Sequence, residues 1–288
     1  MTAVTYTKTR VRQSEMLQLL LLDALYGCSG SQHIIFRGGT SLLWVYGGSR
    51  FSEDLDFVTT LSSDRIQSLL KSVITKTSRA CVAQFGAGHS EHQVKGNRTT
   101  AFKTFFIYRP DSQRERVAVK LEFEFLRKDN LPGFQKHVFR DIPQVSRLIA
   151  SGHLFLPYSS TILLAETPEE ILTDKIRALY ERQYLKGRDI FDLWWIVNQL
   201  GISVNWRMLE NKLVMYQFPF QPSRRPDYFM KAEALPEIQY ALRTDLPRFI
   251  PRDILSVYQE EDFEQFVLTL QQVCAQLQKQ NLCRIFWK

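Results

Sequence analysis

The chain has 288 residues, which is long enough for one large domain or two modest ones, each with its own core. Its composition, 44% hydrophobic and 23% charged, excludes an intrinsically disordered chain. The excess of 37 Lys and Arg over 30 Asp and Glu gives a formal net charge of +7, which weakly favours polyanionic partners such as nucleotides or nucleic acid.

The cysteine spacing and the apolar runs indicate the compartment. The sequence has no C-x-x-C pair and no histidine neighbour at zinc-ligand spacing, so we expect reduced thiols in a cytoplasmic protein. The longest apolar runs, Leu42–Tyr46 and Leu193–Val197, are too short to span a bilayer, and the N-terminus lacks the apolar stretch of a signal peptide. We therefore expect no membrane partner. The four cysteines are Cys28, Cys81, Cys274 and Cys283.

The first predicted element is an amphipathic helix over Ser14–Tyr26, where leucines recur at helical spacing. The short apolar run Ile34–Phe36 predicts a strand that ends at the glycine pair Gly38–Gly39. Thr40 can cap a brief helix that continues to Tyr46. The alternation in Phe51–Val58 predicts a second strand, which carries two aspartates.

Two further strands are predicted at Ala101–Tyr108 and Val117–Phe125. The second of these alternates cleanly, so its apolar residues share one face while Lys120, Glu122 and Glu124 share the other. One face therefore suits a core, and the charged face is left for another purpose.

The character of the sequence changes after Pro157. Thr167 reads as a helix N-cap, followed by Pro168 at the first helical position and Glu170 as the capping-box acid, and this helix should end near Gln183. A second helix should run from about Asp189 to Gly201.

The rest of the chain is predicted to be mainly helical, interrupted by a proline-rich, basic loop at Phe218–Pro226. A stripe of apolar residues from Phe263 to Leu277 marks the last helix. Strands with helices precede helices alone, so we expect an α+β domain with a mixed sheet over residues 1–150 and a helical domain over residues 151–288.

Asp54 and Asp56 are the first candidates for chemistry. They lie one residue apart on a predicted strand, so both carboxylates should project from one face a few ångströms apart. Hard oxygen ligands in this arrangement suit Mg²⁺ or Mn²⁺, which can support phosphoryl transfer. The competing interpretation is a solvated strand face.

The glycine pair gives this hypothesis a second element. Glycine lets backbone N–H groups approach phosphate oxygens, and the N-terminus of the following helix adds a favourable dipole. Thr40 or Ser41 could contribute a hydroxyl. A tight turn that needs a positive φ is the alternative explanation for Gly38 and Gly39.

Together these residues carry a family resemblance. The runs Gly38-Gly39-Thr40-Ser41-Leu42 and Arg50-Phe51-Ser52-Glu53-Asp54-Leu55-Asp56-Phe57, with Tyr46-Gly47 between them, resemble the first motif of the AbiEii family. Members of that family are nucleotidyltransferase-like toxins of bacterial abortive-infection and toxin–antitoxin systems, related to DNA polymerase β-type nucleotidyltransferases. The resemblance implies a polymerase β-type nucleotidyltransferase domain.

The family also has a later carboxylate on an adjacent strand, and Lys120-Leu121-Glu122 resembles it. Glu122 lies on the polar face of its strand and could complete the metal site. Glu124 points the same way and is its rival, and an exposed face would explain both glutamates without a metal.

A second motif resembles the helical segment of the family. It comprises Glu170-Ile171-Leu172, then Lys175-Ile176-Arg177-Ala178-Leu179, then Arg182, and Arg188-Asp189-Ile190-Phe191-Asp192-Leu193-Trp194. In that family the lysine and the aspartate of the Arg-Asp pair are functionally important. Lys175 interrupts an apolar helix face, so its amine needs a partner. The partner could be a triphosphate, or Asp189 or Asp192 in a structural ion pair, or both.

Three further cations are phosphate-binding candidates by position: Arg50, Arg98 and Lys103. The histidine spacing excludes a zinc hydrolase of the H-E-x-x-H type, and the sequence has neither a G-x-S-x-G elbow nor a P-loop. The tryptophans at positions 44, 194, 195 and 206 lie in apolar stretches and are expected in the core.

The resemblance implies a specific division of roles. Asp54, Asp56 and Glu122 would hold Mg²⁺ or Mn²⁺, the Gly38–Ser41 turn and Arg50 would bind the phosphates of an NTP, and Lys175 and Asp189 would assist transfer. The implied acceptor is RNA, including the 3′ end of tRNA, and the implied partner is an antitoxin. A protein or small-molecule acceptor, or a relative that binds nucleotide or RNA without turnover, remains open.

Overall fold

The structure is a computed structural model that describes residues 8–97, 100–112, 115–127, 130–156 and 161–280. The chain divides into two compact units, one ending at Glu166 and the other beginning at Thr167. This division falls after the expected boundary at residue 150, because a strand at Ile162–Glu166 belongs to the sheet of the first unit. In the described parts of the chain, no helix is long and apolar enough to cross a membrane.

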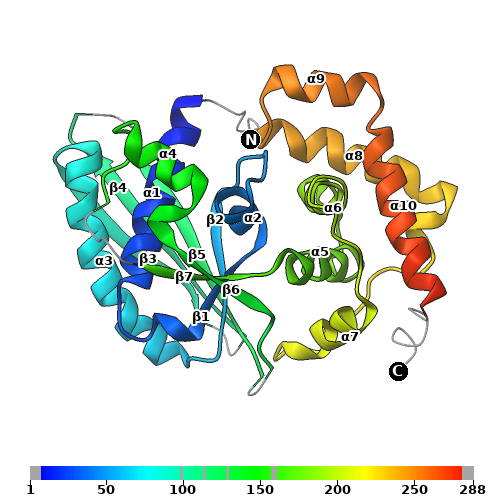
Figure 1. Cartoon of the computed structure of the whole chain (residues 1–288), viewed down its shortest axis with the longest axis horizontal. Coiled ribbons are helices and arrows are strands. Elements are labelled where there is room, and N and C mark those ends of the chain that lie inside the picture. The colour runs from blue at the N-terminus through cyan, green and yellow to red at the C-terminus, as the bar shows by residue number, and fades with distance from the viewer. Residues whose placement is uncertain (1–7, 98–99, 113–114, 128–129, 157–160, 281–288) are drawn as a thin grey trace. The chain divides into compact units, whose positions relative to one another are not determined.

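The first unit is built on one sheet whose described strands follow the order β3-β4-β5-β2-β1-β7-β6 (Figure 1). β2 runs parallel to β5 and β1 runs parallel to β7, while the other neighbours are antiparallel. The expected α+β class with a mixed sheet is therefore confirmed. The strands are β1 (Ile34–Arg37), β2 (Asp54–Thr59), β3 (Gly88–Asn97), β4 (Ala101–Pro110), β5 (Val117–Phe125), β6 (Phe134–Val138) and β7 (Ile162–Glu166).

Two long helices pack together on one face of this sheet (Figure 1). They are α1 (Lys8–Tyr26) and α3 (Ser63–Phe85), and two shorter helices, α2 (Gly38–Tyr46) and α4 (Pro143–Ala150), complete the unit. The alternation predicted for β5 is confirmed, because its odd-numbered residues are buried and its even-numbered residues are partly exposed. The aromatic rings of Phe57 and Phe123 stack in the sheet core with centroids 4.9 Å apart.

Thr40 was expected to cap α2, but it does not. The helix begins at Gly38 with Arg37 as its N-cap, and no side-chain cap hydrogen bond is present there. The glycine pair is thus the first turn of the helix rather than a loop before it. Three of the sheet's strands, β3, β6 and β7, and the helices α3 and α4 were not predicted from the sequence.

The second unit is helical, as expected. The Thr167 side chain accepts a hydrogen bond from the Glu170 amide, and the helix begins at Pro168, so the predicted cap is confirmed. Trp194 and Trp195 are buried, and Trp194 belongs to an aromatic cluster with Phe191, Tyr258 and Phe266. The helices are α5 (Pro168–Glu181), α6 (Gly187–Asn198), α7 (Trp206–Met215), α8 (Leu235–Asp245), α9 (Arg252–Glu260) and α10 (Glu264–Lys279).

Of the remaining core expectations, Trp44 is buried but Trp206 is partly exposed at the first position of α7. Cys28, Cys81 and Cys274 are free thiols, whereas Cys283 lies outside the described residues.

Candidate active site

The glycine turn lies directly against one of the two aspartates. Gly38 has a φ of +76°, and a Cβ atom added there would lie 3.2 Å from Oδ2 of Asp56. Both the backbone conformation and the space therefore require glycine. The structure brings together the start of α2 and the D-x-D strand, which were two separate candidates in the sequence.

Hydroxyl and guanidinium groups fasten this turn to the chain that precedes β2. The Thr40 hydroxyl donates to the carbonyl oxygen of Asp54 and lies 2.8 Å from the Ser52 hydroxyl. The buried Arg50 guanidinium lies where a side chain on Gly39 would be, and it donates to the Phe51 carbonyl at 2.9 Å. Thr40 and Arg50 thus hold the turn in place in this structure.

Ser41 is fully buried in the first turn of α2. Its hydroxyl oxygen makes no hydrogen bond with any residue that the structure describes. A phosphate contact by this hydroxyl stays a prediction.

Strand pairing places four charged residues in one row across the sheet. Arg37 on β1 is opposite Asp56 on β2, Asp56 is opposite Glu122 on β5, and Glu122 is opposite Lys103 on β4. Residues opposite one another in register share a face. The row therefore has two adjacent carboxylates in the middle and one cation at each end. We call these four residues the charged row.

Lys120 lies beside the charged row and forms ion pairs with both Asp54 and Glu122. Its Nζ is 2.7 Å from Asp54 Oδ2 and 3.2 Å from Glu122 Oε2, and Lys103 Nζ is 2.5 Å from Glu122 Oε1. Glu122 is therefore held by two ammonium groups. Its rival Glu124 forms an ion pair with Arg37, so of the two glutamates it is Glu122 that lies opposite Asp56.

The sequence interpretation missed Arg37 and Lys120. Arg37 follows three apolar strand residues and could have been noticed as the last residue before the glycine pair. Lys120 shares a strand face with Glu122, which was the available signal. The phosphate candidate Arg98 lies outside the described residues, whereas Lys103 belongs to the charged row.

The electrostatics of the charged row leave a deficit of positive charge at Asp56. Burial raises the pKa of Asp56, and the neighbouring Asp54 and Glu122 carboxylates raise it further, against the lowering effect of Arg37 and Lys120. Burial also acts to raise the pKa of Glu122, but the hydrogen bond from Lys103 and the charge of Lys120 outweigh it, so this pKa is lowered. Asp56 is thus the carboxylate that an additional cation would stabilise most.

Asp54, Asp56 and Glu122 are the carboxylates of this site that could hold a divalent cation. Within the described residues, no three His, Cys, Asp or Glu side chains already stand in metal-binding geometry. Mg²⁺, however, is commonly held by one or two carboxylates, with waters and substrate phosphates as its other ligands. Asp54 and Asp56 fit that requirement, and Glu122 would join them only on release from its lysines.

The second unit holds Lys175 in a buried ion-pair cluster. Lys175 Nζ is 2.9 Å from Asp189 Oδ1 and 2.7 Å from Asp192 Oδ2, and Arg182 pairs with the other oxygen of Asp189. We call these four residues the Lys175 cluster. The structural ion pair that the sequence allowed is therefore present, and it joins α5 to α6.

Burial acts to raise the pKa of Asp189, but the charges of Lys175 and Arg182 outweigh it, so the pKa lies well below its usual value. Asp189 is ionised at neutral pH and fixes Lys175 on α5. The Lys175 cluster and the charged row belong to different units, each described by itself. That Lys175 acts on the same substrate as Asp54 and Asp56 stays a prediction.

A neighbouring amine should be unusually reactive. Burial and the charges of Arg182 and Arg188 lower the pKa of Lys186 to about 8. Its folded pKa lies below the unfolded value, so its ionisation costs stability below pH 8, and this cost disappears as the pH rises. We expect an amine-reactive reagent at pH 8 to modify Lys186 ahead of an exposed lysine such as Lys71, as measured by peptide mass spectrometry. Equal rates for the two would contradict the lowered pKa.

A second buried lysine joins α5 to α7 in a similar way. Lys212 is fully buried, with Nζ 3.0 Å from Glu170 Oε2 and 3.2 Å from Asp174 Oδ2. Tyr216 donates to the other oxygen of Asp174 at 2.6 Å. The two lysines bind similar carboxylate pairs, which makes Lys212 a natural comparison for Lys175.

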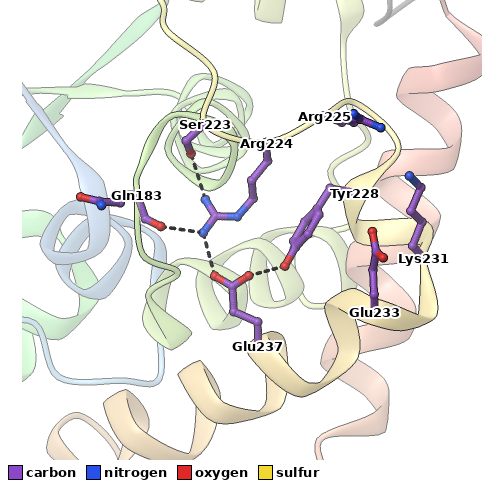
Figure 2. Close-up of a pocket in the computed structure, with 8 residues that line it drawn as sticks. All are labelled: Gln183, Ser223, Arg224, Arg225, Tyr228, Lys231, Glu233 and Glu237. Carbon is purple, nitrogen blue, oxygen red and sulfur yellow. Dashed lines mark hydrogen bonds and ion pairs between the residues drawn. The ribbon is translucent and has the colours of Figure 1, made fainter.

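The proline-rich basic loop closes the C-terminal end of α5. Figure 2 shows Arg224 with its guanidinium directed at Gln183, Ser223 and Glu237. It donates to the carbonyl oxygens of Leu179 and Gln183, each at 3.1 Å, and so binds the negative end of the helix dipole. The loop thereby fixes the turn that contains Arg182, the residue of the Lys175 cluster that pairs with Asp189. A pocket of about 390 Å³ lies beside it.

Comparison with known proteins identifies the family. The sequence profile of AbiEii, described as a nucleotidyl transferase toxin of type IV toxin–antitoxin systems, matches residues 20–268. The chain belongs to the AbiEii family. The matched segment includes the glycine turn, the D-x-D strand and the Lys175 cluster, so the resemblance drawn from the two motifs is confirmed.

Two crystal structures from Helicobacter pylori share the AbiEii chain's fold. JHP933 is 16% identical with a TM-score of 0.56, and the match covers 96% of each chain. A candidate nucleotidyltransferase is 17% identical with a TM-score of 0.54, and the match covers 96% of this chain and 99% of the other. A search of curated proteins finds no match.

The contact between Gly38 and Asp56 leads to a direct test. Gly38→Ala should lower the free energy of unfolding by about 1–2 kcal/mol, because alanine is strained at a positive φ, and should also reduce nucleotide transfer by displacing Asp56. Gly201→Ala is the matched control, because Gly201 has a φ of +68° but no atom within 4 Å of an added Cβ. Chemical denaturation and a transfer assay should show similar destabilisation in both variants and loss of transfer in Gly38→Ala alone. Equal transfer by both variants would show that the contact is unimportant.

Proposed function

We propose that this AbiEii protein is a magnesium-dependent nucleotidyltransferase that transfers a nucleotide from an NTP to RNA. The observation that carries the proposal is the placement of Asp56 between the glycine turn and Glu122, the other carboxylate of the charged row. A turn suited to phosphate beside carboxylates suited to a divalent cation is an arrangement that serves phosphoryl transfer. Family membership supports the same class of reaction.

Asp54 and Asp56 would hold the metal, with Glu122 as the third candidate ligand. Bound Mg²⁺ supplies charge neutralisation for the triphosphate and activation of the acceptor hydroxyl. The backbone amides at the start of α2 would bind phosphate oxygens, helped by the helix dipole. Arg50 lies against Gly39 and would hold the turn in the conformation that exposes these amides.

The reaction is a displacement at the α-phosphorus. The acceptor oxygen forms a bond to that phosphorus, the bond to the bridging oxygen breaks, and pyrophosphate leaves. Lys175 would neutralise charge that develops on the phosphates, with Asp189 and Asp192 fixing its position. The ion pairs account for its orientation, and the phosphate contact is the proposed part.

RNA is the favoured acceptor, including the 3′ end of tRNA. The net charge of +7 supports a polyanionic acceptor. The family is described as a toxin of type IV toxin–antitoxin systems. This description supports a target whose modification harms the cell, and a separate antitoxin that restrains the enzyme.

One experiment separates the possible acceptors. The purified protein is incubated with Mg²⁺, each labelled NTP in turn and total RNA, beside an Asp56→Ala variant and a sample in which EDTA removes the metal. Label on RNA that is absent from both controls is the expected result. Label on the protein would instead indicate protein nucleotidylation, and bound but untransferred nucleotide would indicate a non-catalytic relative.

A further inference from the structure

A second candidate site lies in the first unit, in a pocket separate in sequence from the charged row. The pocket has a volume of about 450 Å³ and is lined by residues of α3, of α4 and of the segment that follows α4. Three cations line it, Lys76 and Arg79 on α3 and Arg140 before α4, and its other lining residues are apolar or glycine. None of the described residues that line it is a carboxylate.

Two of the three cations of the pocket are available to an anionic ligand, whereas Lys76 Nζ donates a hydrogen bond to the Gly27 carbonyl oxygen at 2.7 Å. Neither Arg79 nor Arg140 forms an ion pair with any residue that the structure describes, and Arg79 is exposed. The helix α3 as a whole carries four cations and one carboxylate. Arg65 lies eleven residues before Lys76 and so on the same side of the helix, about 16 Å away along its axis. The basic character therefore extends from the pocket along α3.

An aromatic side chain is fixed at the mouth of the pocket. Phe155 is 56% exposed, whereas its neighbour Leu154 is buried. The Gln84 side chain accepts a hydrogen bond from the Phe155 amide at 3.0 Å and donates to the His153 carbonyl at 2.8 Å. These two bonds tie the backbone of this segment to α3, and the Phe155 side chain lines the same pocket as the cations.

We propose that this pocket binds an unpaired nucleotide of a single-stranded RNA. Phe155 would stack on a base, while Arg79 and Arg140 bind the flanking phosphates. An acidic peptide is disfavoured because its backbone N–H groups need acceptors, and none of the described side chains that line the pocket carries an acceptor oxygen. The inference rests on the proposed function, since it assigns part of the acceptor's binding to this pocket.

Binding can be measured without turnover. A fluorescein-labelled single-stranded RNA of twelve nucleotides is titrated with the full-length protein in the absence of NTP, and anisotropy is read at several salt concentrations. Phe155→Ala should weaken binding by about five- to 150-fold with little change in salt dependence, because it removes stacking. Phe155→Trp should retain binding.

The double variant Arg79→Gln with Arg140→Gln should weaken binding and lower the slope of log Kd against log salt by about 1.4, or about 0.7 per lost phosphate contact. Lys71→Gln is the matched control, because Lys71 is exposed on the same helix but five residues from Lys76 and so on another face. Its slope and affinity should match those of the unmodified protein. Thermal unfolding confirms that each variant is folded.

Three outcomes would overturn the inference. RNA binding by the pocket variants equal to that of the unmodified protein would show that the pocket is not used. If a labelled glutamate-rich peptide binds the pocket and loses affinity in these variants while RNA does not, the pocket takes an acidic protein segment. If the unmodified protein neither binds nor labels RNA, the RNA acceptor fails as well, whereas labelled RNA with unaffected pocket variants leaves the proposed function intact.

Discussion

Replacing Lys175 by methionine should destabilise the protein by about 3 kcal/mol and abolish nucleotide transfer. The ammonium group contacts two buried carboxylates, Asp189 and Asp192, and methionine would leave both without this partner. Removing one partner of a buried pair costs about 3–5 kcal/mol, and Arg182 still compensates part of the charge on Asp189. Urea unfolding followed by circular dichroism measures the loss of stability.

A matched substitution separates the two roles of this lysine. Lys212→Met removes an equally buried ammonium from Glu170 and Asp174, so it should cost similar stability. At a temperature where both variants remain folded, transfer should persist in Lys212→Met and be lost in Lys175→Met. Equal loss of transfer in both would mean that Lys175 serves only to hold α5 and α6 together.

The second large effect is expected at Asp56, where activity and stability should change in opposite directions. Asp56→Asn should reduce transfer by at least about 100-fold, because one charged group aimed at the reacting centre is removed. The same change should raise the melting temperature of the metal-free protein. Because the folded pKa of Asp56 is raised, the stability it contributes in its protonated form is lost as the pH rises through that pKa. Asparagine imitates the protonated form and should retain that stability at neutral pH.

Magnesium provides a readout for Asp56 that does not depend on turnover. Mg²⁺ with a non-hydrolysable NTP should raise the melting temperature of the unmodified protein and have a smaller effect on Asp56→Asn. Asp64→Asn is a suitable control, because Asp64 is an exposed aspartate in the first turn of α3. If Asp56→Asn is destabilising and still binds the metal complex normally, the carboxylate has a structural role instead.

The parts of the fold that follow from local pattern could be predicted. The alternation of β5 and the Thr167 cap were each visible because one residue type recurs at a fixed spacing or a short motif defines the helix start. β3 was missed because it is an edge strand rich in polar residues, with no apolar alternation to mark it. β7 was missed because a continuous apolar run fits a buried strand and a helix equally well.

The site was predictable only in part. The residues that could be predicted are those that lie close together in the sequence. Asp54, Asp56 and Gly38 lie within one short motif, and the structure brings Gly38 against Asp56. Arg37 and Lys120 had only weak signals in the sequence, because their positions beside Asp56 depend on strand register. A shift of one residue between β2 and β5 would have placed Glu122 and Lys120 on the opposite face from Asp56.

The order of strands in the sheet determines when activity can first arise during synthesis. β2, which carries the two aspartates, pairs with β5. The ribosome synthesises β5 only after α3 and the β3–β4 hairpin. A nascent chain that ends before Val117 contains the complete D-x-D motif yet has neither Glu122 nor Lys120 to frame it. A polypeptide that terminates before β5 is therefore expected to lack nucleotide transfer activity.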